Sequence, residues 1–185
     1  MLDQLDKWDR ELFVYLNSLG IEEYDNFWIF VTNIKHWIPL YLLFFVLFFI
    51  AFHKKKALFN SAFLLSAFLT TLAFTNFVKG IAARLRPNND PELLDIIRIL
   101  QSPTNYSFFS GHASSSFVVT TFVVLSLREK YKWIYIFYIW PITFVLSRVY
   151  VGVHYPLDLI VGAIVGFLFG YGFYKLYLLA GKRFY

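Results

Sequence analysis

The chain has 185 residues, of which 58% are hydrophobic and only 16% are charged, with a net charge of +5. A soluble domain carries about 25% charged residues, so this composition predicts a membrane protein. The lack of cysteine excludes disulfides, thiolate metal sites and a cysteine nucleophile, and no basic stripe outside the apolar runs suits nucleic acid.

Residues 1–34 are expected to form an N-terminal amphipathic interfacial segment. Its apolar residues recur at helical spacing between charges: Leu5, Trp8, Leu12, Phe13, Tyr15 and Leu16. This pattern predicts a helix lying in the membrane interface, ended by Gly20. The stretch 24–34 is too short to span alone, so a sixth span there is the less favoured alternative.

Residues 35–185 are expected to form the membrane-embedded domain. Five apolar runs each approach the roughly 20 residues needed to cross a bilayer. They cover about 36–52, 57–78, 108–127, 133–149 and 156–179. The expected fold is therefore all-α, a polytopic membrane helix bundle of about five transmembrane helices.

The short loops indicate an orientation. Basic residues occupy 53–56, 128–132 and 182–183, which the positive-inside rule assigns to the cytoplasm. Alternation then places 79–107 and 150–155 on the outer face. The protein is thus expected in the inner (cytoplasmic) membrane, with any site in these segments facing the periplasm or cell exterior. The outer loop is itself basic, which a function there would explain.

A first polar cluster lies at 79–87. Lys79 and Arg86 are seven residues apart, about two helical turns, so they are predicted to share one helix face before Pro87. Two cations at a membrane boundary suit a phosphate group. The alternative is a pair of interfacial anchors.

A second cluster opens the third run. Ser110 is a good helix N-cap, and Gly111 allows a ligand to approach the backbone. Helix N-termini attract anions, and His112 can offer a proton near neutral pH. The alternative is a plain cap beside an interfacial histidine.

A third cluster precedes and opens the fifth run at Pro156. The spacing of His154 and Asp158 allows the carboxylate to accept a hydrogen bond from one imidazole nitrogen, leaving the other basic and aimed at a substrate. Arg148 adds a third cation. The alternative is a capping Asp with an incidental His, but buried charges at a membrane boundary are costly without a role.

Only one carboxylate is clearly available in these clusters, so no metal site is expected. Metal-free phosphoryl transfer, which depends on positioning and electrostatic stabilisation, is favoured.

At these residues the chain resembles the type 2 phosphatidic acid phosphatase and vanadium haloperoxidase superfamily. Its signature is K-x6-R-P, then P-S-G-H, then S-R-x5-H-x3-D. Residues 79–87 and 147–158 match the first and third motifs at every spacing. The second matches as Ser110-Gly111-His112, with Phe109 in the usual place of Pro, which affects the turn before the helix and no catalytic side chain.

The resemblance implies a role for each residue. His154 would attack phosphorus and form a phosphohistidine, and Asp158 would orient it. His112 would protonate the leaving oxygen and then activate water. The phosphate oxygens would be held by the remaining motif residues: Lys79, Arg86, Ser110, Gly111 and Arg148. The resemblance implies no metal and no organic cofactor.

The implied partners are the bilayer and a lipid phosphate: undecaprenyl pyrophosphate, which the expected topology suits best, phosphatidylglycerol phosphate, phosphatidic acid or lipid A phosphate. The connection 88–107 is expected to form either a lid whose isoleucines touch the lipid chain or a short amphipathic surface helix. Two alternatives stay open: a lipid phosphotransferase with the same intermediate, and a non-catalytic lipid-binding or transport protein. The sequence does not set the oligomeric state.

Overall fold

The computed structural model describes the backbone of residues 2–184 and the side chains of residues 3–181. Within that range the regular structure is entirely helical, which confirms the expected all-α class. In chain order the elements are α1 (Leu2–Ser18), η1 (Glu22–Tyr24), α2 (Asp25–Thr32), η2 (Ile34–Trp37), α3 (Ile38–Ala51), α4 (Lys54–Ala82), η3 (Pro87–Asn89), α5 (Gly111–Leu127), η4 (Lys132–Tyr138), α6 (Ile139–Tyr150) and α7 (Pro156–Phe184).

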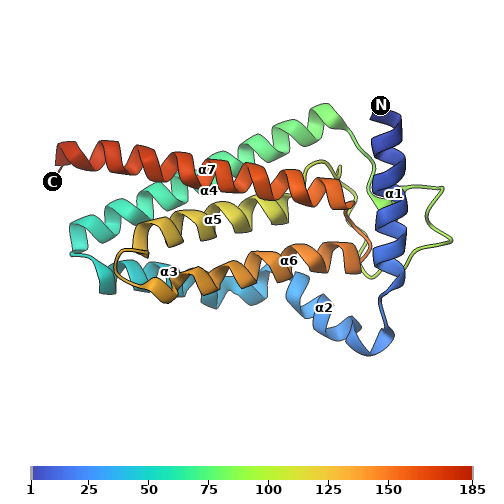
Figure 1. The fold of residues 1–185 in the computed structure, drawn as a ribbon, viewed down its shortest axis with the longest axis horizontal. Helices are drawn as coiled ribbons and strands as arrows, with labels where there is room; N and C mark the ends of the chain where they lie inside the picture. Colours follow the sequence, from blue (N-terminus) through green and yellow to red (C-terminus); the bar gives the residue numbers. More distant parts are fainter. Residues whose placement is uncertain (1, 185) are drawn as a thin grey trace.

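Helices α3 to α7 run along one axis as a bundle, and α1 lies across one end of it (Figure 1). Among the described residues, four helical stretches are long and apolar enough to cross a membrane: Ile34–Ala51, Lys54–Asn89, Lys132–Tyr150 and Pro156–Gly181. The remaining expected run, 108–127, is the shorter apolar helix α5. The protein is therefore a multi-pass membrane protein.

Helix α5 packs against α3, α4, α6 and α7, and most of its side chains are buried. Its contact with α7 is close because three glycines of α7 face it. A Cβ added at Gly162, Gly166 or Gly170 would meet an α5 atom, or the Ser110 cap of α5, at 2.7, 2.4 or 2.8 Å. Small residues at four-residue spacing let two helix backbones approach in this way.

Several details differ from the expected runs. Helix α5 begins at Gly111 rather than at 108, because Ser110 caps it, accepting a hydrogen bond from the Ala113 amide at 3.4 Å. Helix α4 continues to Ala82 and ends at Ala83, which adopts a left-handed conformation with φ of 45°. The fourth run begins as the 3-10 helix η4.

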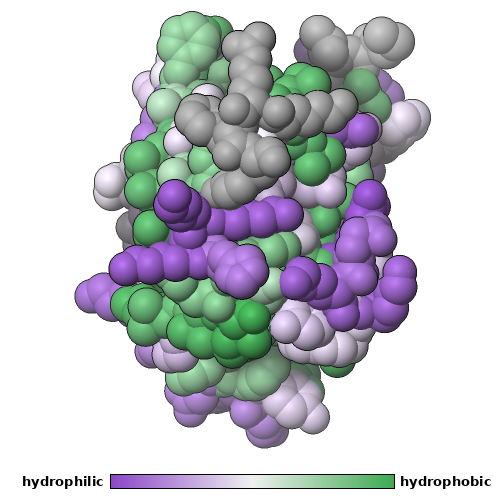
Figure 2. Space-filling view, turned by 90° about the vertical axis from the view of Figure 1, so that its left-hand side faces the viewer, coloured by the Kyte–Doolittle hydropathy of each residue, from purple (hydrophilic) through white to green (hydrophobic). Residues whose placement is uncertain are grey.

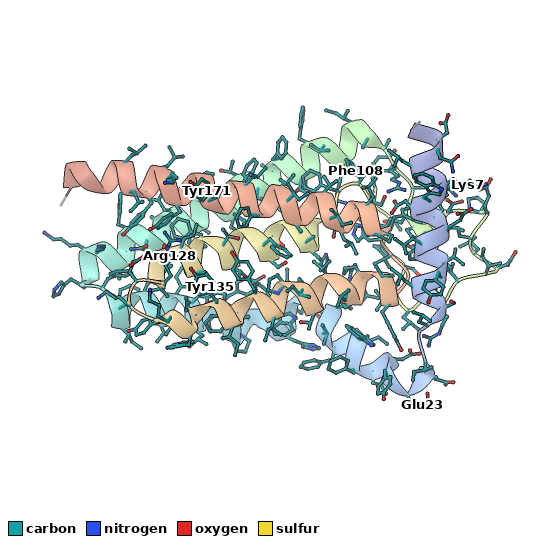
Figure 3. The ribbon with its side chains drawn as sticks, in the orientation of Figure 1. Lys7, Glu23, Phe108, Arg128, Tyr135 and Tyr171 are labelled. Carbon is teal, nitrogen blue, oxygen red and sulfur yellow. The ribbon has the colours of Figure 1, made fainter. Side chains whose placement is uncertain are left out.

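The basic turns at 53–56 and 128–132 lie at the bundle end opposite α1. Figure 2 looks onto that end and shows hydrophilic side chains gathered there. Arg128 and Tyr135 lie toward this end in Figure 3, whereas Lys7 and Glu23 lie at the other. The side chains of Lys182 and Arg183 lie outside the described residues. The two described basic turns thus share one end, as expected.

One face of helix α1 packs against the bundle. Asp9, Phe13 and Asn17, at four-residue intervals, are buried. Five large hydrophobic residues of α1 are exposed instead: Leu5, Trp8, Leu12, Tyr15 and Leu16. These residues would contact lipid if α1 lies at a membrane surface, and that position stays a prediction.

The connection 88–107 forms η3 and a series of turns, so the alternative of a short amphipathic helix there is wrong. Its backbone crosses the same bundle end as α1. Ile97 packs against the buried cluster that contains Phe13 and Leu93, while Ile96 is exposed.

Candidate active site

The cations of the first motif converge although they do not share a helix face. Lys79 lies in the last turn of α4, but the helix ends at Ala83, so Arg86 follows in extended backbone. The shared face expected from the seven-residue spacing is therefore wrong. The left-handed residue Ala83 redirects the chain, and both side chains are buried at the α1 end of the bundle.

The segment 105–107 holds these two cations. Lys79 Nζ donates to the carbonyl oxygens of Tyr106 and Ser107 at 2.5 and 2.8 Å. Arg86 donates to the carbonyl and side-chain oxygens of Asn105 at 2.7 and 2.9 Å. These bonds fix the two cations in the low-dielectric interior, where an unpaired charge is costly.

His154 and Asp158 form the hydrogen bond that their spacing predicts. The distance from His154 Nδ1 to Asp158 Oδ2 is 3.2 Å, and both side chains are fully buried. The other imidazole nitrogen, Nε2, lies 2.9 Å from NH1 of Arg86. The first and third motifs therefore meet at the imidazole.

The second motif joins the same site. The Ser110 amide donates to the carbonyl oxygen of Asp158 at 3.0 Å, which fastens the start of α5 to the first turn of α7. His112 lies in the first turn of α5, its ring 5.0 Å from the Phe144 ring, and it interacts electrostatically with Arg148 and His154. A Cβ at Gly111 would meet only Thr75, at 3.8 Å, so the backbone there is open.

Arg148 is buried near the end of α6. Its NH1 donates to the hydroxyl of Thr32 in α2 and to Gln101 Oε1 at 3.1 Å. Its Nε is buried without a partner among the described residues. A buried guanidinium N–H with no acceptor is costly, and an anion bound there would satisfy it.

Burial lowers the pKa of His154 well below 6.5, and the positive charges of Arg86, Arg148 and Lys79 lower it further. The imidazole is therefore neutral at neutral pH, the form that can act as a nucleophile. No group of three or more His, Cys, Asp or Glu side chains within the described part of the chain is arranged to hold a metal ion.

Several residues around the site were not predicted from the sequence. Arg84 is one of the basic residues of the outer loop and was not singled out, yet its NH1 lies 2.9 Å from Asp158 Oδ1. Thr32, Gln101 and Asn105 hold motif arginines and were not singled out. An arginine two residues before Arg86, in a chain with few charges, was the available signal for Arg84.

Comparisons with known proteins give the same family as the resemblance. The family model described as PAP2 superfamily matches residues 57–182. A lipid A 4'-phosphatase of Porphyromonas gingivalis is 32% identical over 182 residues, covering 95% of this chain and 75% of that protein. An undecaprenyl-diphosphatase of Sulfolobus acidocaldarius is 32% identical over 162 residues, covering 84% of this chain and 72% of that protein.

The fold has a solved counterpart. The crystal structure of a transmembrane PAP2-type phosphatidylglycerolphosphate phosphatase from Bacillus subtilis superposes with a TM-score of 0.77, over 94% of this chain and 86% of that one, at 19% identity. The motifs, the family model and the two relatives confirm the resemblance found in the sequence, and the chain belongs to the PAP2 superfamily.

Proposed function

We propose that this protein is a membrane lipid phosphatase that hydrolyses a phosphomonoester or pyrophosphate through a phosphohistidine at His154. The observation that carries the proposal is the position of His154 between Asp158 and Arg86. One ring nitrogen is held by a carboxylate while the other faces the cation of a separate motif. This arrangement orients a nucleophile toward an anionic group.

The reaction has two steps. His154 Nε2 attacks phosphorus, and the bond from phosphorus to the leaving oxygen breaks while His112 donates a proton to that oxygen. The leaving oxygen is the lipid ester oxygen of a phosphomonoester or the bridging oxygen of a pyrophosphate. Water then attacks the phosphohistidine, His112 accepts its proton, and the N–P bond breaks to release phosphate. Lys79, Arg86 and Arg148 balance the charge on the phosphate oxygens, with the Ser110 hydroxyl and the Gly111 N–H as further donors.

Lipid A-type phosphate and undecaprenyl pyrophosphate are the preferred substrates. The relatives named for these two activities match 95% and 84% of this chain. The site would face the periplasm or cell exterior, because the basic turns at 53–56 and 128–132 lie at the opposite end and favour the cytoplasm. A lipid headgroup would then enter from the outer leaflet of the inner membrane.

The test is phosphate release by purified protein in detergent from four lipids: lipid A phosphate, undecaprenyl pyrophosphate, phosphatidylglycerol phosphate and phosphatidic acid. His154→Ala should abolish release from any lipid that the wild type hydrolyses. His53→Ala is the matched control, because His53 is exposed at the opposite end. Free phosphate also distinguishes hydrolysis from transfer to a lipid acceptor. Phosphate release by His154→Ala would contradict the proposal. So would a wild-type protein that releases phosphate from none of the four lipids.

A further inference from the structure

An ion-pair network connects Asp158 to the N-terminal helix. NH1 of Arg84 donates to Oδ1 of Asp158 at 2.9 Å. NH2 of the same guanidinium donates to Oδ1 of Asp6 and Oδ2 of Asp9, both at 2.8 Å. Arg84 occupies one of the unspecified positions of the K-x6-R-P motif, so the signature assigns it no role, and its side chain is 18% exposed. One planar guanidinium thus joins α1 to a fully buried carboxylate in α7.

Asp9 is the firmer of the two anchors on α1. Its side chain is 6% exposed, whereas that of Asp6 is 46% exposed. The second carboxylate oxygen of Asp9 accepts a hydrogen bond from the Leu157 amide at 2.8 Å. Amides in the first turn of a helix lack partners within that helix, so Asp9 satisfies one beside Asp158. The ribbon shows α1 passing across this end of α7 (Figure 1).

Arg84 holds the oxygen of Asp158 that does not face the imidazole. Oδ2 accepts the Tyr155 amide at 3.1 Å and lies against His154 Nδ1, and Oδ1 is taken by Arg84. Both oxygens are therefore held by named donors. Without Arg84, a buried carboxylate would lose its charge partner, which is strongly unfavourable, and it could turn away from His154.

We propose that Arg84, held by Asp9, is a positioning residue that fixes Asp158 for its role beside His154, so that α1 forms part of the active site. The inference rests on the proposed function, because it assumes that His154 is the nucleophile. Arg84 acts through Asp158 and not on the phosphate. Its loss should therefore lower kcat and leave substrate binding unchanged.

The main test is Arg84→Lys. Lysine keeps the positive charge, but it has one ammonium group in place of the forked guanidinium. It therefore cannot donate to Asp158 and Asp9 at the same time in the geometry that arginine allows. We expect kcat to fall by about tenfold or more, with KM and competitive inhibition by inorganic phosphate changed by less than about twofold. Arg98→Lys is the matched control. Arg98 pairs with Asp25 at the same bundle end and lies over the Tyr150 ring. Within the described residues its side chain contacts none of the proposed site residues, so kcat should be unchanged.

A second variant, Asp9→Asn, tests whether Asp9 holds Arg84, because asparagine has nearly the same shape as aspartate but no charge. Asp9 accepts from two donors, Leu157 N–H and Arg84. Whichever way an asparagine amide is turned, its NH2 group faces one of these donors, and the hydrogen bond to that donor is lost. We expect kcat to fall by about threefold to tenfold at unchanged KM. Monodispersity and thermal unfolding in detergent show whether each variant is folded.

The outcomes separate the alternatives. Wild-type kcat in folded Arg84→Lys would overturn the inference. Raised KM and weaker phosphate inhibition at unchanged kcat would also overturn it, because Arg84 would then bind phosphate. If Arg84→Lys does not fold, Asp9→Asn decides by the same criteria. Activity in His154→Ala, measured in parallel, would instead overturn the proposed function itself.

Discussion

Arg86 and His154 share a short contact: NH1 of the guanidinium lies 2.9 Å from Nε2 of the imidazole. Nε2 is the atom proposed to attack phosphorus. The same NH1 donates to the Val153 carbonyl oxygen at 2.9 Å. The guanidinium therefore lies directly in front of the nucleophile, and an incoming phosphate would take its place as the partner of Nε2 while keeping it as a donor.

Replacement of Arg86 should lower kcat/KM more than replacement of Asn105, which accepts hydrogen bonds from Arg86. Arg86→Lys removes forked donation to phosphate, and hydrogen bonds to charged groups contribute about 1.5–3 kcal/mol, so kcat/KM should fall by roughly 10- to 100-fold. Asn105→Ala removes one acceptor but keeps the Asn105 carbonyl bond, so its loss should be smaller. Steady-state kinetics on the preferred lipid compares them. An equal loss in both variants would indicate that Asn105 contacts the substrate.

The charge state of His154 should depend on pH in a specific direction. Burial, and then the charges of Arg86, Arg148, Lys79 and Arg84, lower its pKa well below 6.5. A histidine with a lowered pKa is neutral at every pH above that value and becomes protonated only as the pH falls below it. Imidazole ¹⁵N NMR of histidine-labelled protein, assigned with His154→Asn, should show the neutral form at pH 6.5. Half-protonation at pH 6.5 or above would contradict this prediction.

The sequence was sufficient for the fold class, the family and the motif residues that gather at the site. Apolar runs of membrane-spanning length predicted the helices, and the i, i+4 spacing of His154 and Asp158 predicted their contact. These features depend on local periodicity, which the sequence carries directly.

The missed features depend on contacts between distant residues or on a single backbone angle. Arg84 and Asp9 are 75 positions apart, so no spacing rule connects them. The convergence of Lys79 and Arg86 was attributed to a continuous helix, but it depends on the left-handed backbone at Ala83. An alanine gives no signal for that conformation, since glycine is the residue that favours it.

Catalysis should not require a divalent metal. The charge on the phosphate is balanced in the proposed mechanism by Lys79, Arg86 and Arg148, which are all buried at one bundle end. Phosphate release should therefore be unchanged, within about twofold, after treatment with EDTA. A loss of activity that Mg²⁺ or another divalent ion restores would overturn the metal-free mechanism.

The packing of α5 on α7 should control both stability and the geometry of the site. A Cβ at Gly166 would lie 2.4 Å from the Ser114 carbonyl oxygen, a backbone atom that cannot move aside. Overpacking of this kind costs about 1–3 kcal/mol, so Gly166→Ala should lower the thermal unfolding temperature in detergent. Gly172 lies on the same helix with no atom within 4 Å of an added Cβ, so Gly172→Ala is the matched control.

Gly162→Ala should combine this loss of stability with a loss of activity. Its added Cβ would lie 2.7 Å from the Ser110 carbonyl oxygen, at the point where the Ser110 amide is bonded to Asp158. Separation of the two helices there would move the start of α5, including His112, away from His154. We therefore expect Gly162→Ala to lose more kcat than Gly166→Ala at a similar loss of unfolding temperature. If the two variants lose kcat equally, the effect is one of general stability, and the contact at Gly162 has no separate role in aligning the second and third motifs.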